Sequence, residues 1–91
     1  MNRYLVTFSD YQNESERQDI IDSIKQLGGW ARINDYTYCI KCNHSSTVSV
    51  RESILGNKNK KCRLFVLNIT HSAWASYGLP SEVSSWLKDK E

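Results

Sequence analysis

The chain lacks the features that assign a small protein to a membrane or secreted class. No apolar run approaches the ~20 residues that span a bilayer. The first residues also lack a basic segment followed by an apolar one, which would indicate a secretory signal. Net charge is only +2, from 12 Lys and Arg against 10 Asp and Glu, a balance that does not by itself favour nucleic acid or membrane. We therefore expect a cytoplasmic protein without membrane contact.

Cysteine is scarce as well. Three cysteines, an odd number without a secretory signal, predict reduced thiols and no structural disulfide. Cys39 and Cys42 have the spacing of a metal or redox pair, but residues three apart in a strand point to opposite faces. We expect them to be buried apolar groups, and we expect no cofactor.

The residues that are present suffice for one folding unit. Ninety-one residues of 40% hydrophobic composition can close one core but not two. Residues 1–91 are therefore predicted to form a single domain, with its core over residues 3–70 and a Trp-rich appendage over residues 71–91.

Hydrophobic periodicity predicts the elements of this domain. Alternation of apolar and polar residues predicts strands, and an apolar stripe every three or four residues predicts helices. The predicted strands cover residues 3–9, 30–33, 36–42 and 62–70, and the predicted helices cover about residues 14–27, 47–55 and 81–88.

Local signals predict how some of these elements end. Asn13 is expected to cap the first helix, and Gly28 or Gly29 is expected to end it in the left-handed conformation. The strand at residues 62–70 is apolar on both sides, which is typical of a strand covered on both faces, or on one face and an edge. We expect it to lie in the core.

The order β-α-β-β-α-β predicts an α+β, ferredoxin-like sandwich with an antiparallel four-stranded sheet and two helices on one face. In space, the strands would follow the order fourth, first, third, second. The other face of the sheet would be covered by the Trp-bearing tail or by a second subunit. In that tail Trp74, Tyr77 and Trp86 are the candidate residues for contact with a partner or a second subunit.

The first strand ends on a hydroxyl and a carboxylate, Ser9 and Asp10, and these are the candidate catalytic residues. One Asp10 carboxylate per chain, doubled in a symmetric dimer, would supply the oxygen ligands that Mg²⁺ prefers. The alternative is that both side chains only cap the connection into the first helix.

Positive charge gathers after Gly56. Residues 1–56 carry six basic and seven acidic side chains, whereas residues 57–91 carry six basic and three acidic ones. A short lysine-rich stretch either follows a phosphate backbone or is a solvated connection. The candidate nucleic-acid-binding residues are Lys58, Lys60, Lys61, Arg63 and Arg32.

A set of apolar and Trp positions runs through nearly the whole chain: Tyr4-Leu5-Val6, Gly29-Trp30, the Ser46-capped helix, Leu64–Ile69, Ala73-Trp74 and Trp86-Leu87. Together they resemble a family of small bacterial and phage proteins labelled SinR-like. That family looks related to the small CRISPR-associated endonuclease of spacer acquisition and to the VapD-type toxin ribonucleases.

The resemblance implies a ferredoxin-like fold and homodimerisation through the sheets. In the nuclease relatives a Tyr-Asp pair closes the first strand, and paired Asp residues from two subunits hold a divalent metal. This sequence has Phe8-Ser9 at that place and Asp10 one residue later. An offset of one residue moves a strand side chain to the opposite face, so the sequence departs from the nuclease pattern at its metal-binding position.

Two functions remain as hypotheses. The first is a non-catalytic homodimeric module that binds a macromolecule, protein or nucleic acid, as a phage or mobile-element accessory or inhibitor protein would. The alternative is a Mg²⁺-dependent nuclease or toxin ribonuclease that uses the carboxylate of Asp10.

Overall fold

The computed structural model describes residues 1–56 and 60–89. Its elements are, in chain order, β1 (Asn2–Ser9), α1 (Glu14–Lys25), β2 (Gly29–Asn34), β3 (Thr37–Cys42), α2 (Thr47–Leu55), β4 (Arg63–Asn68) and α3 (Ser81–Lys88). None of the helices in this part of the chain has the length and apolar character needed to cross a bilayer.

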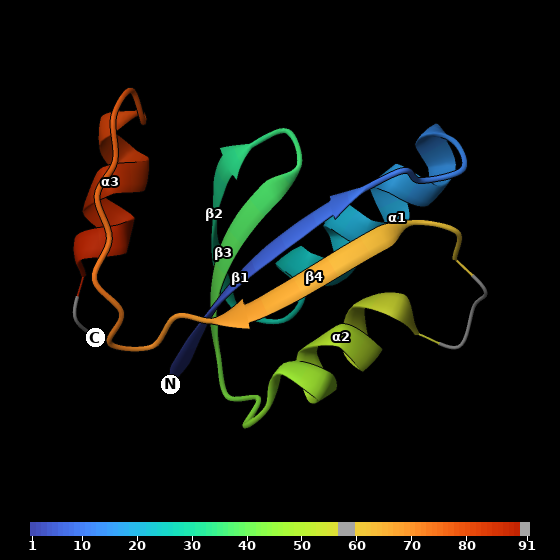
Figure 1. Cartoon of the computed structure of the whole chain (residues 1–91), viewed down its shortest axis with the longest axis horizontal. Coiled ribbons are helices and arrows are strands. Elements are labelled where there is room, and N and C mark those ends of the chain that lie inside the picture. Colours follow the sequence, from blue (N-terminus) through green and yellow to red (C-terminus); the bar gives the residue numbers. More distant parts are fainter. Residues whose placement is uncertain (57–59, 90–91) are drawn as a thin grey trace.

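The strands form one antiparallel sheet in the order β2-β3-β1-β4. This is the predicted order read from the opposite edge, so the α+β fold with a four-stranded antiparallel sheet is confirmed. Figure 1 shows α1 and α2 on one side of the sheet and α3 on the other side, next to β2. The face toward α1 and α2 is called the inner face below, and the opposite face the outer face.

The core lies between the inner face and the two helices. Strand β1 alternates in burial along its length, and its Tyr4, Val6 and Phe8 are at most 1% exposed. They pack with the apolar stripes of α1 and α2, which include Ile24 and Ile54. Each such side chain contributes about 1.5–3 kcal/mol on burial, so β1 fixes the position of both helices.

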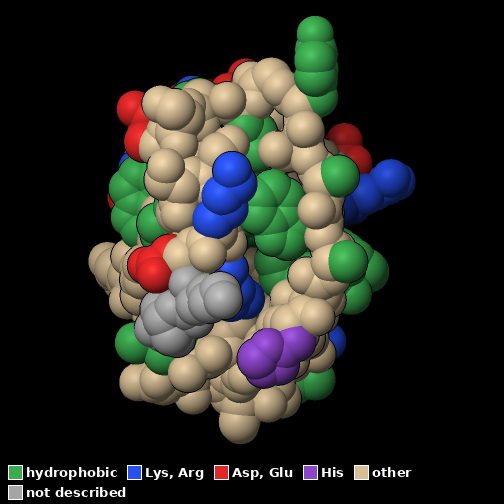
Figure 2. Space-filling model, turned by 90° about the vertical axis from the view of Figure 1, so that its left-hand side faces the viewer, with side chains coloured by type: hydrophobic (Ala, Val, Ile, Leu, Met, Phe, Trp, Pro, Cys, Tyr) green, Lys and Arg blue, Asp and Glu red, His purple; other side chains and the backbone are tan. Residues whose placement is uncertain are grey.

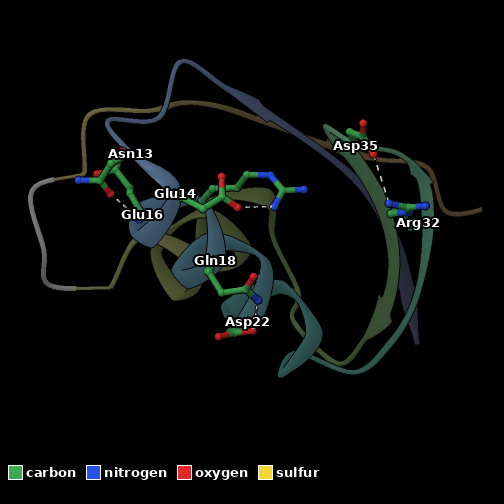
Figure 3. Close-up of polar contacts among 8 residues, drawn as sticks. Asn13, Glu14, Glu16, Gln18, Asp22, Arg32 and Asp35 are labelled. Atoms are coloured by element: carbon green, nitrogen blue, oxygen red, sulfur yellow. Dashed lines mark hydrogen bonds and ion pairs between the residues drawn. The ribbon is translucent and has the colours of Figure 1, made fainter.

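The surface of α1 carries local polar contacts, drawn in Figure 3. Asn13 caps the helix, because its side-chain oxygen accepts a hydrogen bond from the backbone N–H of Glu16 at 2.9 Å, as predicted. Glu14 pairs with Arg17 at 2.9 Å one turn further on. Such pairs on a helix surface contribute only about 0.3–0.5 kcal/mol, so the cap and the buried stripe hold α1.

The end of α1 differs from the prediction. Gln26 caps the helix in a right-handed conformation, and neither Gly28 nor Gly29 has a positive φ. The predicted left-handed cap is therefore wrong. Gly28 serves a different need, because a Cβ at this position would overlap the backbone carbonyl oxygen of Lys41.

Strand β4 also differs from the prediction. Among the strands of the described residues it pairs only with β1, so it is an edge strand. Leu64 and Val66 are partly buried against the core, but Phe65 is 58% exposed and Leu67 is 47% exposed. The expectation that this whole strand lies in the core is therefore wrong, since alternation sends Phe65 and Leu67 to the outer face.

The contact at Gly28 gives a direct test of the packing between the α1–β2 connection and β3. We expect Gly28→Ala to lower the free energy of unfolding by about 1–3 kcal/mol, because the added methyl group forces two backbone segments apart. Urea denaturation followed by circular dichroism measures this change.

Gly29→Ala is the matched control. A Cβ at Gly29 would meet only the Trp86 ring, at 3.8 Å, which is an ordinary contact. A Gly28→Ala protein as stable as Gly29→Ala would contradict the close approach at Lys41.

Candidate functional site

The outer face of the sheet combines charged and apolar side chains from its two central strands. In the register of β1 with β3, Arg3 lies opposite Lys41 and Leu5 lies opposite Cys39. Cys39 is on this outer face, whereas Cys42 belongs to the core cluster on the inner face. The prediction that these two thiols point to opposite faces is therefore confirmed.

The appendage folds back over part of the outer face. The Trp86 ring on α3 lies beside Gly29 and 4.5 Å from Nζ of Lys41. Arg3 donates from Nη1 to the backbone carbonyl of Leu87 at 2.6 Å, and Leu87 itself is 8% exposed. These contacts dock α3 against β2 and β3. The appendage thus supplies part of the cover that the sequence predicts for this face of the sheet.

Between the sheet and the appendage lies an apolar cavity of about 450 Å³. Its floor is the outer face, and its roof is α3 together with the segment of residues 72–79, which we name the strap. Figure 2 looks at this side of the molecule and shows hydrophobic side chains inside a depression between two raised segments. The main apolar lining residues are Leu5, Ile33 and Cys39 below, and Trp74, Leu79 and Leu87 above.

A second cavity of about 400 Å³, lined mainly by polar and charged residues, adjoins the first, and Arg3 lines both. Lysine and arginine side chains border the depression in Figure 2, and a histidine lies below it. Nζ of Lys41 lies 3.6 Å from the carboxylate of Asp89, and the Lys41 side chain is only 8% exposed. The charged lining of this cavity is Arg3, Lys41, Lys88, His71 and Asp89.

The candidate catalytic residues lie at the other end of β1. Asp10 follows the strand with a φ of 55°, in the left-handed region. Its side chain is 61% exposed, and its carboxylate forms an ion pair with Arg63, 3.1 Å from Nε. The Ser9 hydroxyl donates to the same carboxylate at 3.5 Å. Within residues 1–56 and 60–89, no three His, Cys, Asp or Glu side chains gather as a metal site would require.

The structure does not gather the candidate nucleic-acid-binding residues into one patch. Lys58 lies outside the described residues. Lys60 donates from Nζ to the carbonyl of Leu55 at 2.9 Å, so it caps the end of α2. Lys61 and Arg63 are exposed near the start of β4, whereas Arg32 is on β2, the opposite edge strand, where it pairs with Asp35.

The three candidate partner residues take different positions. Trp74 is 45% exposed, and Tyr77, which also belongs to the strap, is fully exposed. Trp86 instead packs within the chain, against Gly29 and Lys41. Two of the three aromatic residues are thus free to meet a partner, and the third holds the appendage in place.

Sequence reasoning missed Arg3 as a site residue. The available signal was that Arg3 and Lys41 are cations in the two central strands, at positions that alternation assigns to the face away from the helices. A charge at such a position needs a polar neighbour or solvent. The appendage supplies polar neighbours, the carbonyl of Leu87 for Arg3 and the carboxylate of Asp89 for Lys41.

No protein-family model matches this chain, and no curated protein matches it in sequence. The resemblance to the SinR-like family and its nuclease relatives therefore stays a prediction.

Burial of Cys39 generates a prediction on pH. Burial raises the pKa of this thiol to about 11, and the positive charge of Arg3 opposes the shift only in part. Between pH 9, the ordinary value, and about pH 11, the unfolded chain has lost this proton while the folded chain keeps it. The stability that the protonated Cys39 thiol contributes is therefore fully present below pH 9 and is lost as the pH rises through this window.

Thermal denaturation at a series of pH values checks this expectation. We expect the melting temperature to fall less between pH 9 and 11 in Cys39→Ala than in the unchanged protein. Equal pH dependence of the two proteins would mean that Cys39 ionises as freely in the folded state as in the unfolded chain.

Proposed function

We propose that this protein is a non-catalytic homodimeric module that binds a macromolecular partner. The observation that carries the proposal is the uncovered part of the outer face along β4, where Phe65 and Leu67 are 58% and 47% exposed. Exposed apolar side chains that are neighbours on one face of a sheet mark sites of protein contact. Asp10, in contrast, is held in a surface ion pair with Arg63.

Strand β4 offers two means of pairing with a second copy. Its free edge carries backbone groups that can pair with another strand, and Phe65 and Leu67 lie across from Thr7 and Leu5 on β1. Burial of an apolar side chain of this size contributes about 1.5–3 kcal/mol. We place the dimer contact here, along β4, which leaves the strap and the cavity available to the partner.

The dimer contact is tested by placing a charge in it. We expect Phe65→Lys to weaken the dimer at least about tenfold, because the lysine would have to lose its water at the centre of the contact. Sedimentation velocity at a series of protein concentrations measures the dissociation constant.

Tyr36→Lys is the matched control, since Tyr36 is an aromatic residue of similar exposure, 50%, in the turn between β2 and β3. A protein that is monomeric at all concentrations, or a dimer that Phe65→Lys leaves intact, would contradict this dimer contact.

One observation favours the alternative, a Mg²⁺-dependent nuclease. The left-handed backbone of Asp10 turns the chain directly after β1. The alternation of strand side chains therefore ends at Ser9 and does not decide to which face Asp10 points. In such a nuclease, the Asp10 carboxylate of each subunit would have to leave the Arg63 of its own chain, and the two carboxylates would have to meet across the dimer contact.

Labelled RNA and DNA incubated with and without Mg²⁺ separate the two functions. Because Arg63 already neutralises Asp10, we expect Asp10→Asn to behave like the unchanged protein. Mg²⁺-dependent cleavage that Asp10→Asn abolishes would favour the nuclease and contradict the binding module.

A further inference from the structure

The apolar cavity, the cationic cavity and the strap lie together on one side of the molecule. We infer that they form a binding site for the free carboxyl terminus of a protein partner whose last side chain is apolar. This inference deepens the proposed function and rests on its binding role, because it names the part of the partner that is recognised.

The apolar cavity suits one bulky side chain and the residues next to it. Its volume of about 450 Å³ falls in the range of about 300–1,000 Å³ that is usual for ligand sites. Leu5, Ile33 and Cys39 form its floor, and none of them carries a charge. An aliphatic or aromatic side chain would therefore gain by leaving water here.

The adjoining cavity suits a carboxylate. Within residues 1–56 and 60–89, three cationic side chains, Arg3, Lys41 and Lys88, line it together with one acid, Asp89, which leaves an excess of two positive charges before His71 is counted. Nη1 of Arg3 is bonded to the carbonyl of Leu87, and this bond holds the guanidinium at the junction of the two cavities. A planar guanidinium binds a carboxylate through paired hydrogen bonds.

The strap favours a peptide over a free fatty acid, which would have the same carboxylate and an apolar chain. Residues 73–77 are all exposed and belong to no helix or strand. Among the described backbone hydrogen bonds outside regular elements, Ser72 to Ile69 is the only one that begins or ends within residues 72–79. An extended peptide has backbone groups that can pair with such a segment, whereas a fatty acid has none.

A pair of probes that differ only at the carboxyl end tests the site. The first probe is an N-acetylated pentapeptide that ends in Val-Leu with a free carboxylate, and the second is the same peptide as its C-terminal amide. Isothermal titration calorimetry with the full chain should show saturable binding of the carboxylate. We expect the amide to bind at least about tenfold more weakly, because it lacks the charge that Arg3 would pair with.

Two variants connect the binding to the cationic cavity. We expect Arg3→Gln and Lys88→Gln each to lower the affinity for the carboxylate probe but to leave the weak binding of the amide unchanged. Arg3→Gln also loses the contact that holds Leu87, so circular dichroism must confirm its fold. Lys88 is exposed at the end of α3, and Lys88→Gln therefore tests the charge without that complication. Arg51→Gln, an exposed arginine on α2 paired with Glu52, is the matched control.

Three results would overturn the inference. The first is no binding of the carboxylate probe up to ~1 mM, and the second is equal binding of the carboxylate and the amide. The third is tighter binding of octanoate than of the peptide, which would identify a fatty acid site. Sedimentation of the same samples reports the dimer separately, so loss of this site and loss of the proposed dimer can be told apart.

Discussion

The antiparallel pairing of β1 with both β3 and β4 is the interaction on which the rest of the structure depends. Because β1 is paired on both edges, its register decides which of its side chains face the helices and which face outward. Tyr4 and Val6 face the helices and close the core, while Arg3 and Leu5 face outward and become part of the cavity lining. A register shift of one residue in this strand would destroy the core and the candidate site together.

The appendage covers one part of the outer face, where the proposed binding site lies, and leaves the part along β4 exposed. The Trp86 ring lies beside Gly29 and over Nζ of Lys41, and Arg3 donates to the carbonyl of Leu87. The appendage therefore reaches the side of the sheet made by β2 and β3 but leaves Phe65 on β4 uncovered. The same appendage thus separates the proposed ligand site from the proposed surface for a second copy.

The two ends of β1 carry opposite chemistry. At the carboxyl end, Asp10 and Arg63 neutralise each other in solvent, where such a pair contributes about 0.2–1 kcal/mol. At the amino end, Arg3 is near an excess of positive charge and an apolar cavity. Sequence reasoning favoured the carboxyl end, because a strand that ends in Ser-Asp resembles a catalytic pattern, whereas the pairing with Arg63 joins residues far apart in the chain.

The sequence by itself determined the elements and the cap at Asn13, because periodicity and capping depend on residues close together in the chain. The strand order followed from the order of these elements and the right-handed crossovers that join them. Only the tertiary structure decided how exposed each outward side chain is. Phe65 and Leu5 follow the same alternation, yet the tail reaches over Leu5 and leaves Phe65 in solvent. That difference depends on where residues 72–88 return to the sheet, and it follows from packing between distant segments rather than from any local pattern.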